Sequence, residues 1–106
     1  MFELVKIQTR PSKDIQFFSS ADSPDVTAET RQYLVKNFRN TGKIISSETS
    51  WSEDGLTMTT VSFWRDREAL LEYLCDPIIA DGITIHNTAY NKKHNITSTV
   101  SVPKEK

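Results

Sequence analysis

The chain has 106 residues, of which 37% are hydrophobic and 25% charged, and its formal net charge is −1. This length supports one compact core, so we expect a single domain over residues 1–103 and a short solvated tail at residues 104–106. The near-zero charge provides no electrostatic footprint for nucleic acid or for an anionic membrane surface. The N-terminus shows no basic region followed by a long apolar run, so we expect a cytoplasmic protein without a membrane span.

The first part of the chain predicts a strand followed by a long loop. Residues 2–9 mix alternating polarity with β-branched side chains, which is typical of a strand. Residues 10–23 are mostly polar but contain two adjacent phenylalanines, Phe17 and Phe18. Two interpretations of this pair are open, because one ring could close the edge of the core or the loop could cover a pocket.

An amphipathic helix is predicted over residues 24–41, where apolar side chains recur at three- and four-residue steps. Ser23 is the expected N-cap, because Pro24 suits the first helical position. Gly42 is expected to end the helix.

Residues 43–52 and 56–64 predict two strands joined by a hairpin, in which Gly55 is available for a positive φ. The second strand runs almost directly into a further helix, for which Asp66 is the expected N-cap. This helix must end before Pro77, since proline disfavours helical geometry in the residue that precedes it.

Residues 78–95 allow two interpretations, a helix capped by Asp81 or a loop with one short turn. The helix is favoured because no glycine or proline interrupts its second half. Residues 95–102 predict a last strand. Cys75 is the only cysteine, so an intrachain disulfide is excluded and we expect a small buried side chain there.

The order β-α-β-β-α-(α)-β predicts a four-stranded antiparallel sheet with helices on one face, which is the ferredoxin-like arrangement. The three later strands are almost uncharged, with Glu48 as the one charged residue of 44–52, 56–64 and 95–102, and the strand at 56–64 carries large apolar side chains on both faces. A sheet with one free face normally alternates apolar with strongly polar residues. We therefore infer a homodimer in which a second copy covers the free sheet face. The alternative is that serine and threonine side chains simply solvate this face.

The stretch from Val61 to Leu74, VSFWRDREALLEYL, resembles a motif of the antibiotic biosynthesis monooxygenase-like family, whose members are dimeric α/β barrels of about this size. In that family a strand that ends in an aromatic residue runs into a helix of the form W-x-[SD]-x-x-A-[LF]-x-x-[YW]-L. The matching positions here are Trp64, Asp66, Ala69, Leu70, Tyr73 and Leu74. We expect Trp64 to pack at this corner. We expect Ala69, Leu70 and Leu74 to dock the helix on the sheet.

The family includes cofactor-free oxygenases of aromatic polyketides and haem-degrading enzymes. The haem-degrading members need an Asn in the first strand, a Trp in the second helix and a His after it. Residues 2–9 contain no Asn, Tyr73 stands at the position of the helix Trp, and Ile83 lies near the position of the His, three residues before His86. The resemblance therefore implies no haem degradation, and we expect neither a bound cofactor nor a metal ion.

A pocket in such a fold is expected between the sheet and its helices, with its mouth near the long first loop. Five aromatic residues are candidates to line a substrate pocket: Tyr33, Phe38, Trp51, Trp64 and Tyr73. His86 and Tyr90 are the candidate catalytic residues, because a hydrogen-bonded pair of these types could exchange protons with a substrate or orient it. Each candidate also has a purely structural interpretation. Tyr33 and Phe38 would lie in the core, Trp64 at the strand–helix corner, and Trp51 at the dimer contact or the hairpin end. The pair of His86 and Tyr90 would lie on a solvated helix face.

Two functions from different classes remain open. The first is a small monooxygenase-like enzyme that oxidises a small aromatic or apolar substrate without a cofactor. The second is a non-catalytic dimeric module that binds a small ligand or a protein partner. The sequence contains no phosphate-binding glycine loop, no metal-ligand spacing of Cys and His, and no nucleophile elbow. A pocket near Trp64 and His86 would favour the enzyme, and a filled interior would favour the binding module.

Overall fold

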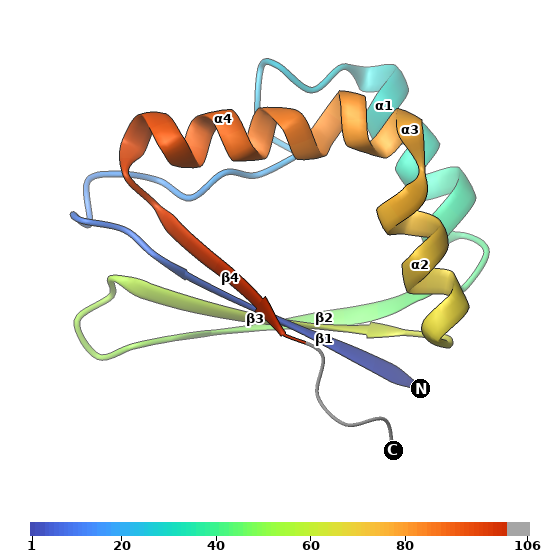
Figure 1. The fold of residues 1–106 in the computed structure, drawn as a ribbon, viewed down its shortest axis with the longest axis horizontal. Helices are drawn as coiled ribbons and strands as arrows, with labels where there is room; N and C mark the ends of the chain where they lie inside the picture. Colours follow the sequence, from blue (N-terminus) through green and yellow to red (C-terminus); the bar gives the residue numbers. More distant parts are fainter. Residues whose placement is uncertain (102–106) are drawn as a thin grey trace.

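The structure is a computed structural model that describes residues 1–101. Four strands form one antiparallel sheet in the order β2-β3-β1-β4, and the helices lie on one face of it (Figure 1). The strands are β1 Phe2–Thr9, β2 Ile44–Trp51, β3 Thr57–Trp64 and β4 Thr97–Ser101. The predicted ferredoxin-like fold is therefore confirmed. The predicted end of the last strand at residue 102 and the predicted tail lie outside the described residues.

Two helical segments connect the strands, one between β1 and β2 and one between β3 and β4. The bounds are α1 Ala28–Leu34, the π-helical segment η1 Val35–Arg39, α2 Arg67–Cys75, α3 Pro77–Ile79, the π-helical segment η2 Ala80–Thr84 and α4 Ile85–His94. Because α3, η2 and α4 follow one another without a break, the helix predicted over residues 78–95 is confirmed. No helix within residues 1–101 is long and apolar enough to cross a membrane.

The first helix begins later than the sequence indicates. Its N-cap is Thr27, whose side chain accepts a hydrogen bond from the backbone N–H of Thr30 at 3.2 Å. Ser23, the predicted cap, lies in the turns that precede the helix. The guanidinium of Arg31 donates to three backbone carbonyls between residues 20 and 26 and holds these turns in place. The prediction of Ser23 was wrong because these hydrogen bonds from Arg31 hold the segment in turns and the helix begins only after it.

Asp76, and not Asp81, caps the second helical run, which is the continuous run of α3, η2 and α4. Its Oδ1 atom accepts hydrogen bonds from the backbone N–H groups of Ile78 and Ile79, at 2.8 and 3.2 Å. Pro77 then occupies the first helical position, where a missing N–H costs nothing. The prediction of Asp81 was wrong because the helix has already begun and passes through this residue within η2.

The corner between β3 and α2 forms as the sequence predicts. The side chain of Asp66 accepts a hydrogen bond from the backbone N–H of Ala69 at 2.8 Å and caps α2. Trp64, the last residue of β3, is 3% exposed. Strand and helix are therefore joined by a short connection that leaves little freedom in the angle between them.

The face that α2 turns to the core differs from the predicted one. Leu70 is buried as expected, but Leu74 is 58% exposed and Tyr73 packs against the core in its place. Cys75 is also exposed. Both predictions, that Leu74 docks the helix and that Cys75 is buried, were wrong because α2 packs along one narrow face only.

The apolar core occupies one end of the space between the sheet and the helices. Its buried members are Phe2, Val26, Phe38, Trp64, Ala69, Leu70, Ile79 and Ile83. From β1 the core takes Phe2 and the partly buried Leu4, while the next two inward-facing residues of this strand are Lys6 and Gln8. On its sheet side, the other end of this space therefore carries two polar side chains in place of the apolar ones that β1 gives to the core.

Candidate functional site

A pocket of about 450 Å³ lies between α4 and the long loop that follows β1. Its volume is within the range of small-molecule sites, roughly 300–1,000 Å³. The loop contributes Gln16, Phe17, Phe18, Ser19, Asp22, Ser23, Pro24 and Asp25, and α4 contributes His86, Ala89, Tyr90, Lys93 and His94. The structure thus brings both predicted catalytic residues to one pocket.

The two phenylalanines hold the loop against different parts of the protein. Phe18 packs against the core, and its ring meets that of Tyr90 edge-on at a centroid distance of 5.8 Å. Phe17 packs on Trp51 at 5.7 Å, and the guanidinium of Arg10 lies 5.0 Å from its ring. Phe18 therefore closes the edge of the core, and both rings line the pocket. The two interpretations of this pair, a closure of the core and a loop over a pocket, are compatible.

The predicted hydrogen-bonded pair of His86 and Tyr90 is not formed. The hydroxyl of Tyr90 donates instead to the backbone carbonyl of Gln16 at 2.5 Å, and its ring lies 4.3 Å from that of His94. The imidazole of His86, which lines the pocket, makes no hydrogen bond within residues 1–101. Tyr90 therefore anchors the loop to α4, while the imidazole of His86 remains available to a ligand.

The five aromatic residues predicted to line a substrate pocket lie outside the lining of this one. Four of them form a chain of tilted and edge-to-face rings in the core: Tyr33, Phe38, Tyr73 and Trp64. Phe38 and Trp64 are 2% and 3% exposed, so packed side chains surround them. Trp51 is 52% exposed and lies at the hairpin end of β2. A contact of these residues with substrate stays a prediction.

Loop residues are the part of the pocket that the sequence did not identify. Polar side chains such as Gln16 and Asp22 have no pattern that distinguishes them from other surface residues. The available signal was the pair Phe17 and Phe18, since adjacent large apolar residues in a polar loop need cover. What the sequence could not provide is the partner, because the contact from Gln16 to Tyr90 spans 74 residues.

The pocket offers no clear site for a metal ion. Within residues 1–101, no group of three or more His, Cys, Asp or Glu side chains converges. His86 and His94 both line the pocket, but eight residues of helix separate them by about 12 Å. They cannot both ligate one ion at roughly 2 Å.

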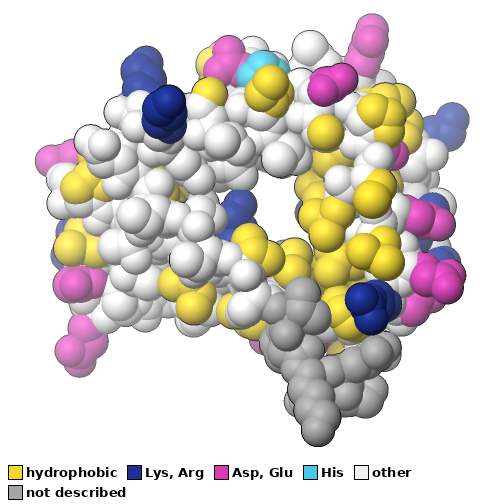
Figure 2. All heavy atoms as spheres, in the orientation of Figure 1, with side chains coloured by type: hydrophobic (Ala, Val, Ile, Leu, Met, Phe, Trp, Pro, Cys, Tyr) yellow, Lys and Arg dark blue, Asp and Glu magenta, His cyan; other side chains and the backbone are white. Residues whose placement is uncertain are grey.

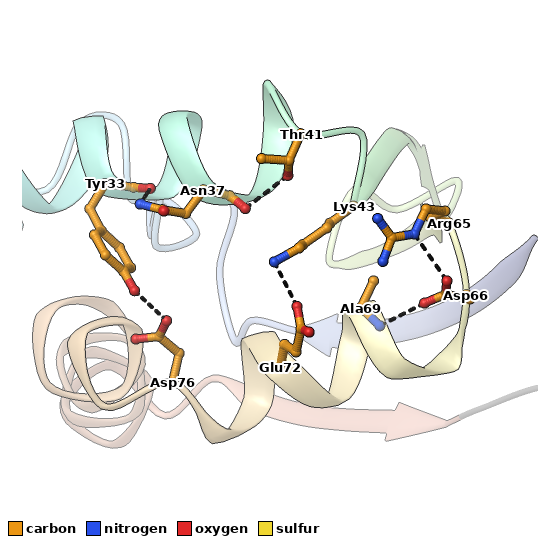
Figure 3. A network of polar contacts seen from close by, with 9 residues as sticks. All are labelled: Tyr33, Asn37, Thr41, Lys43, Arg65, Asp66, Ala69, Glu72 and Asp76. Carbon is orange, nitrogen blue, oxygen red and sulfur yellow. Dashed lines mark hydrogen bonds and ion pairs between the residues drawn. The ribbon is translucent and has the colours of Figure 1, made fainter.

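A polar network lies between α1, η1 and α2, beside the aromatic chain (Figure 3). The hydroxyl of Tyr33 donates to Oδ2 of Asp76 at 2.6 Å, and Nζ of Lys43 lies 2.7 Å from Oε2 of Glu72. The hydrogen bond to Asp76 raises the pKa of Tyr33, and burial raises the pKa of Tyr73. Asp76 thus both caps the second helical run and fixes Tyr33 over it.

These two tyrosines predict a loss of stability at alkaline pH. Both phenols have a raised pKa in the folded state, whereas the unfolded chain ionises them at about pH 10. Their contribution to the free energy of unfolding is therefore complete below about pH 10 and is lost as pH rises through the raised pKa values. Urea unfolding at a series of pH values should show this decline, and Tyr73→Phe should reduce it. A free energy of unfolding that is unchanged at alkaline pH would contradict the expectation.

Comparison with known proteins finds similarity among solved structures only. No protein-family model matches the sequence, and no curated protein matches it. A dimeric ferredoxin-like protein from an uncultured marine organism has a TM-score of 0.58 and 14% identity, covering 100% of this chain and 98% of that chain. An antibiotic biosynthesis monooxygenase has a TM-score of 0.55 and 14% identity, covering 100% and 99%.

A further similar structure is that of SnoaB, a cofactor-independent oxygenase from Streptomyces nogalater. Its TM-score is 0.54 and its identity 13%, and the match covers 99% of this chain and 92% of that chain. At such identities the similarity establishes a shared fold. The resemblance to antibiotic biosynthesis monooxygenase-like proteins, first inferred from residues 61–74, is confirmed at this level.

Proposed function

We propose that this chain, which shares the ferredoxin-like fold of antibiotic biosynthesis monooxygenase structures, oxidises a small aromatic or apolar substrate without a bound cofactor. The observation that carries the proposal is the pocket between the loop and α4, which combines the rings of Phe17 and Phe18 with the imidazole of His86. Apolar rings beside polar and titratable groups, among them Asp22, Lys93 and His94, suit a small ligand that has both apolar and polar parts. The fold adds support by analogy only.

In the proposed reaction the substrate itself supplies the electrons. His86 acts as the general base and removes a phenolic proton, which makes the substrate ring more electron-rich toward molecular oxygen. One oxygen atom enters the substrate at a ring CH₂ group that becomes a carbonyl, and the other leaves as water with the two hydrogens of that group. Tyr90 is a positioning residue in this scheme, because its hydroxyl is bound to the carbonyl of Gln16.

Oxygen uptake with a phenolic substrate that carries such a ring CH₂ group tests the proposal. We expect His86→Ala to lower turnover by about 10²-fold or more, which is the usual contribution of a general base. Tyr90→Phe should mainly raise KM, since it removes the hydrogen bond that holds the loop. Lys92→Ala, an exposed change on α4 outside the pocket lining, is the matched control. Turnover that is unchanged in His86→Ala would exclude the assigned base.

A non-catalytic ligand-binding module is the second candidate. It is favoured by the hydroxyl of Tyr90, which is engaged with the loop and therefore not directed at a ligand. Quenching of protein fluorescence by an aromatic ligand, without oxygen uptake or a spectral change in that ligand, would support this candidate over the enzyme.

We also propose that the protein is a homodimer through the face of the sheet opposite the helices. The central pairs of β1 and β3 place Val5, Ile7, Val61 and Phe63 on this face. Ile7 is 40% exposed, and all helices of residues 1–101 lie on the opposite face of the sheet (Figure 1). Light scattering should give twice the mass of the 12.1 kDa chain. Val61→Lys places a charge in the proposed interface, so the measured mass should fall to that of one chain. A monomer at micromolar concentration would contradict the proposal.

A further inference from the structure

The space between the sheet and α4 contains buried polar side chains where the apolar core ends. Side chains alternate along β1, so Lys6 and Gln8 point to the same face as Phe2 and Leu4, toward the helices. Figure 2 shows an opening that passes between α4 and the sheet. The sheet side of this space therefore presents an ammonium group and a carboxamide beside the apolar Met58 and Val100, which pair with Gln8 and Lys6.

The helix side of the same space carries two further carboxamides. Asn87 and Asn91 follow the buried Ile83 at steps of four residues, so the three share one face of the helical run. The side-chain oxygens of Gln8, Asn87 and Asn91 are all buried, and each lacks a hydrogen-bond partner within the described part of the chain. Gln8 is only 4% exposed. Buried polar groups are normally paired, so three orphaned amide oxygens indicate missing donors.

The turn between α4 and β4 brings Asn91 on the helix close to Gln8 on the sheet. After α4 the chain turns at Asn95, which has a φ of +57°, and the N–H of Ile96 donates to the carbonyl of Asn91. Two residues later Ser98 pairs with Gln8 across the sheet. Asn91 therefore lies near the end of the space that Gln8 occupies, and α4 and β4 diverge from this point (Figure 1).

Spacing along the two elements is similar. Lys6 and Gln8 are separated by about 7 Å along β1, and Asn87 and Asn91 by about 6 Å along α4. Because the two spacings are similar, a compact molecule in this space could contact side chains of both β1 and α4.

Lys6 supplies the charge of this space. Burial lowers its pKa below the ordinary value, and both ion pairs found within residues 1–101 involve other cations. Its cross-strand neighbours are the uncharged Thr60 and Val100. An ammonium group that is partly removed from water and has no carboxylate beside it is complementary to an anionic ligand.

We propose that the space bounded by Lys6, Gln8, Asn87 and Asn91 binds a small hydroxycarboxylate. The ligand carboxylate accepts hydrogen bonds from the ammonium group of Lys6, and the ligand hydroxyls donate to the orphaned amide oxygens. This β1–α4 site is separate from the pocket of His86 and Tyr90, whose lining contains none of these four residues. It goes beyond the proposed oxidation, and its test does not depend on that reaction.

Three probes of one size separate the two parts of this recognition. Glycerate has a carboxylate and two hydroxyls, propionate lacks the hydroxyls, and glycerol carries a third hydroxyl in place of the carboxylate. Titration of the ¹⁵N-labelled full chain with each probe should show amide shift changes in β1 and α4. We expect glycerate to bind at least about tenfold more tightly than either other probe, which corresponds to about one lost charged contact.

Two variants test the assigned residues. Lys6→Met keeps the apolar stem but removes the charge, and should weaken glycerate binding by about tenfold or more. Lys92→Met makes the same change at an exposed position of α4 and should leave binding unchanged. Gln8→Met should also weaken binding, while raising the melting temperature of the ligand-free protein, because it removes an unpaired buried oxygen. A purely structural Gln8 would lower the melting temperature instead.

The proposal is overturned if glycerate produces no shift changes in β1 and α4, or if the three probes bind equally. It is also overturned if Lys6→Met binds glycerate as the unmodified chain does. Folding of each variant is checked by circular dichroism. Should Lys6→Met fail to fold, the comparison of probes and Gln8→Met still decide the outcome. Failure here leaves the oxidation proposal intact, since that is read from oxygen uptake in His86 and Tyr90 variants.

Discussion

Replacing Trp64 by alanine is expected to lower the free energy of unfolding by about 3–5 kcal/mol. Trp64 is 3% exposed, pairs with Phe2 across the sheet and packs on Tyr73 at a centroid distance of 5.1 Å. Its indole N–H donates to the hydroxyl of Ser62 at 3.0 Å, so the ring is fixed at both its apolar and its polar side. Small domains are stable by only about 5–15 kcal/mol, so this loss approaches global unfolding.

Urea unfolding, followed by circular dichroism, measures the loss. Trp51→Ala is the matched control, because it removes the same side chain from a position that is 52% exposed. We expect its cost to be less than half of that for Trp64→Ala. An equal loss in both variants would show that the corner between β3 and α2 is not the centre of the core.

Gly82→Ala is the second change with a large expected effect, and here two terms oppose each other. Alanine is favoured over glycine within a helix by about 1 kcal/mol. However, a Cβ atom at position 82 would lie 2.6 Å from Cγ2 and 2.8 Å from Oγ1 of Thr30. Overpacking of this kind typically costs about 1–3 kcal/mol. We expect a net loss of stability, because the contact joins α1 to η2 and both helices would have to move apart.

Thr30→Ala provides the background that isolates this contact. The two closest atoms, Cγ2 and Oγ1, are then gone, and Cβ of residue 30 remains at 3.3 Å, a contact that a shift of a few tenths of an ångström relieves. Gly82→Ala in that background should therefore be neutral or stabilising through helix propensity. The change of sign between the two backgrounds, measured by thermal unfolding, is the result that the close packing predicts. Equal effects in both backgrounds would mean that α1 and η2 do not meet at Gly82.

Elements with local signals could be predicted from the sequence. Asp66 caps α2 because a carboxylate three residues before the backbone N–H of Ala69 needs no distant partner. Gly55 turns the β2–β3 hairpin with a φ of +72° for an equally local reason. Both features follow from conformational preferences within a few residues, and tertiary packing did not override them.

Features that depend on contacts of a side chain beyond its nearest neighbours in the sequence were predicted less well. Ser23 has the chemistry of an N-cap, but Arg31 binds the backbone of that segment and the helix begins after Thr27. On α2 the periodicity fits either Tyr73 or Leu74, and only the position of the aromatic chain selects Tyr73 for the core. In the first place the hydrogen bonds of Arg31 decide where the helix begins, and in the second the packing of the aromatic rings decides which side chain is buried.

The sequence by itself determined the order of strands and helices, and through it the ferredoxin-like fold, because periodicity and turn chemistry are properties of neighbouring residues. It also selected His86 and Tyr90, which meet in one pocket. Tertiary structure alone decided that Tyr33, Phe38, Tyr73 and Trp64 pack against one another in the core. It also decided that the loop around Gln16 closes on α4. These contacts join residues far apart in the chain, and no local preference specifies such a pairing.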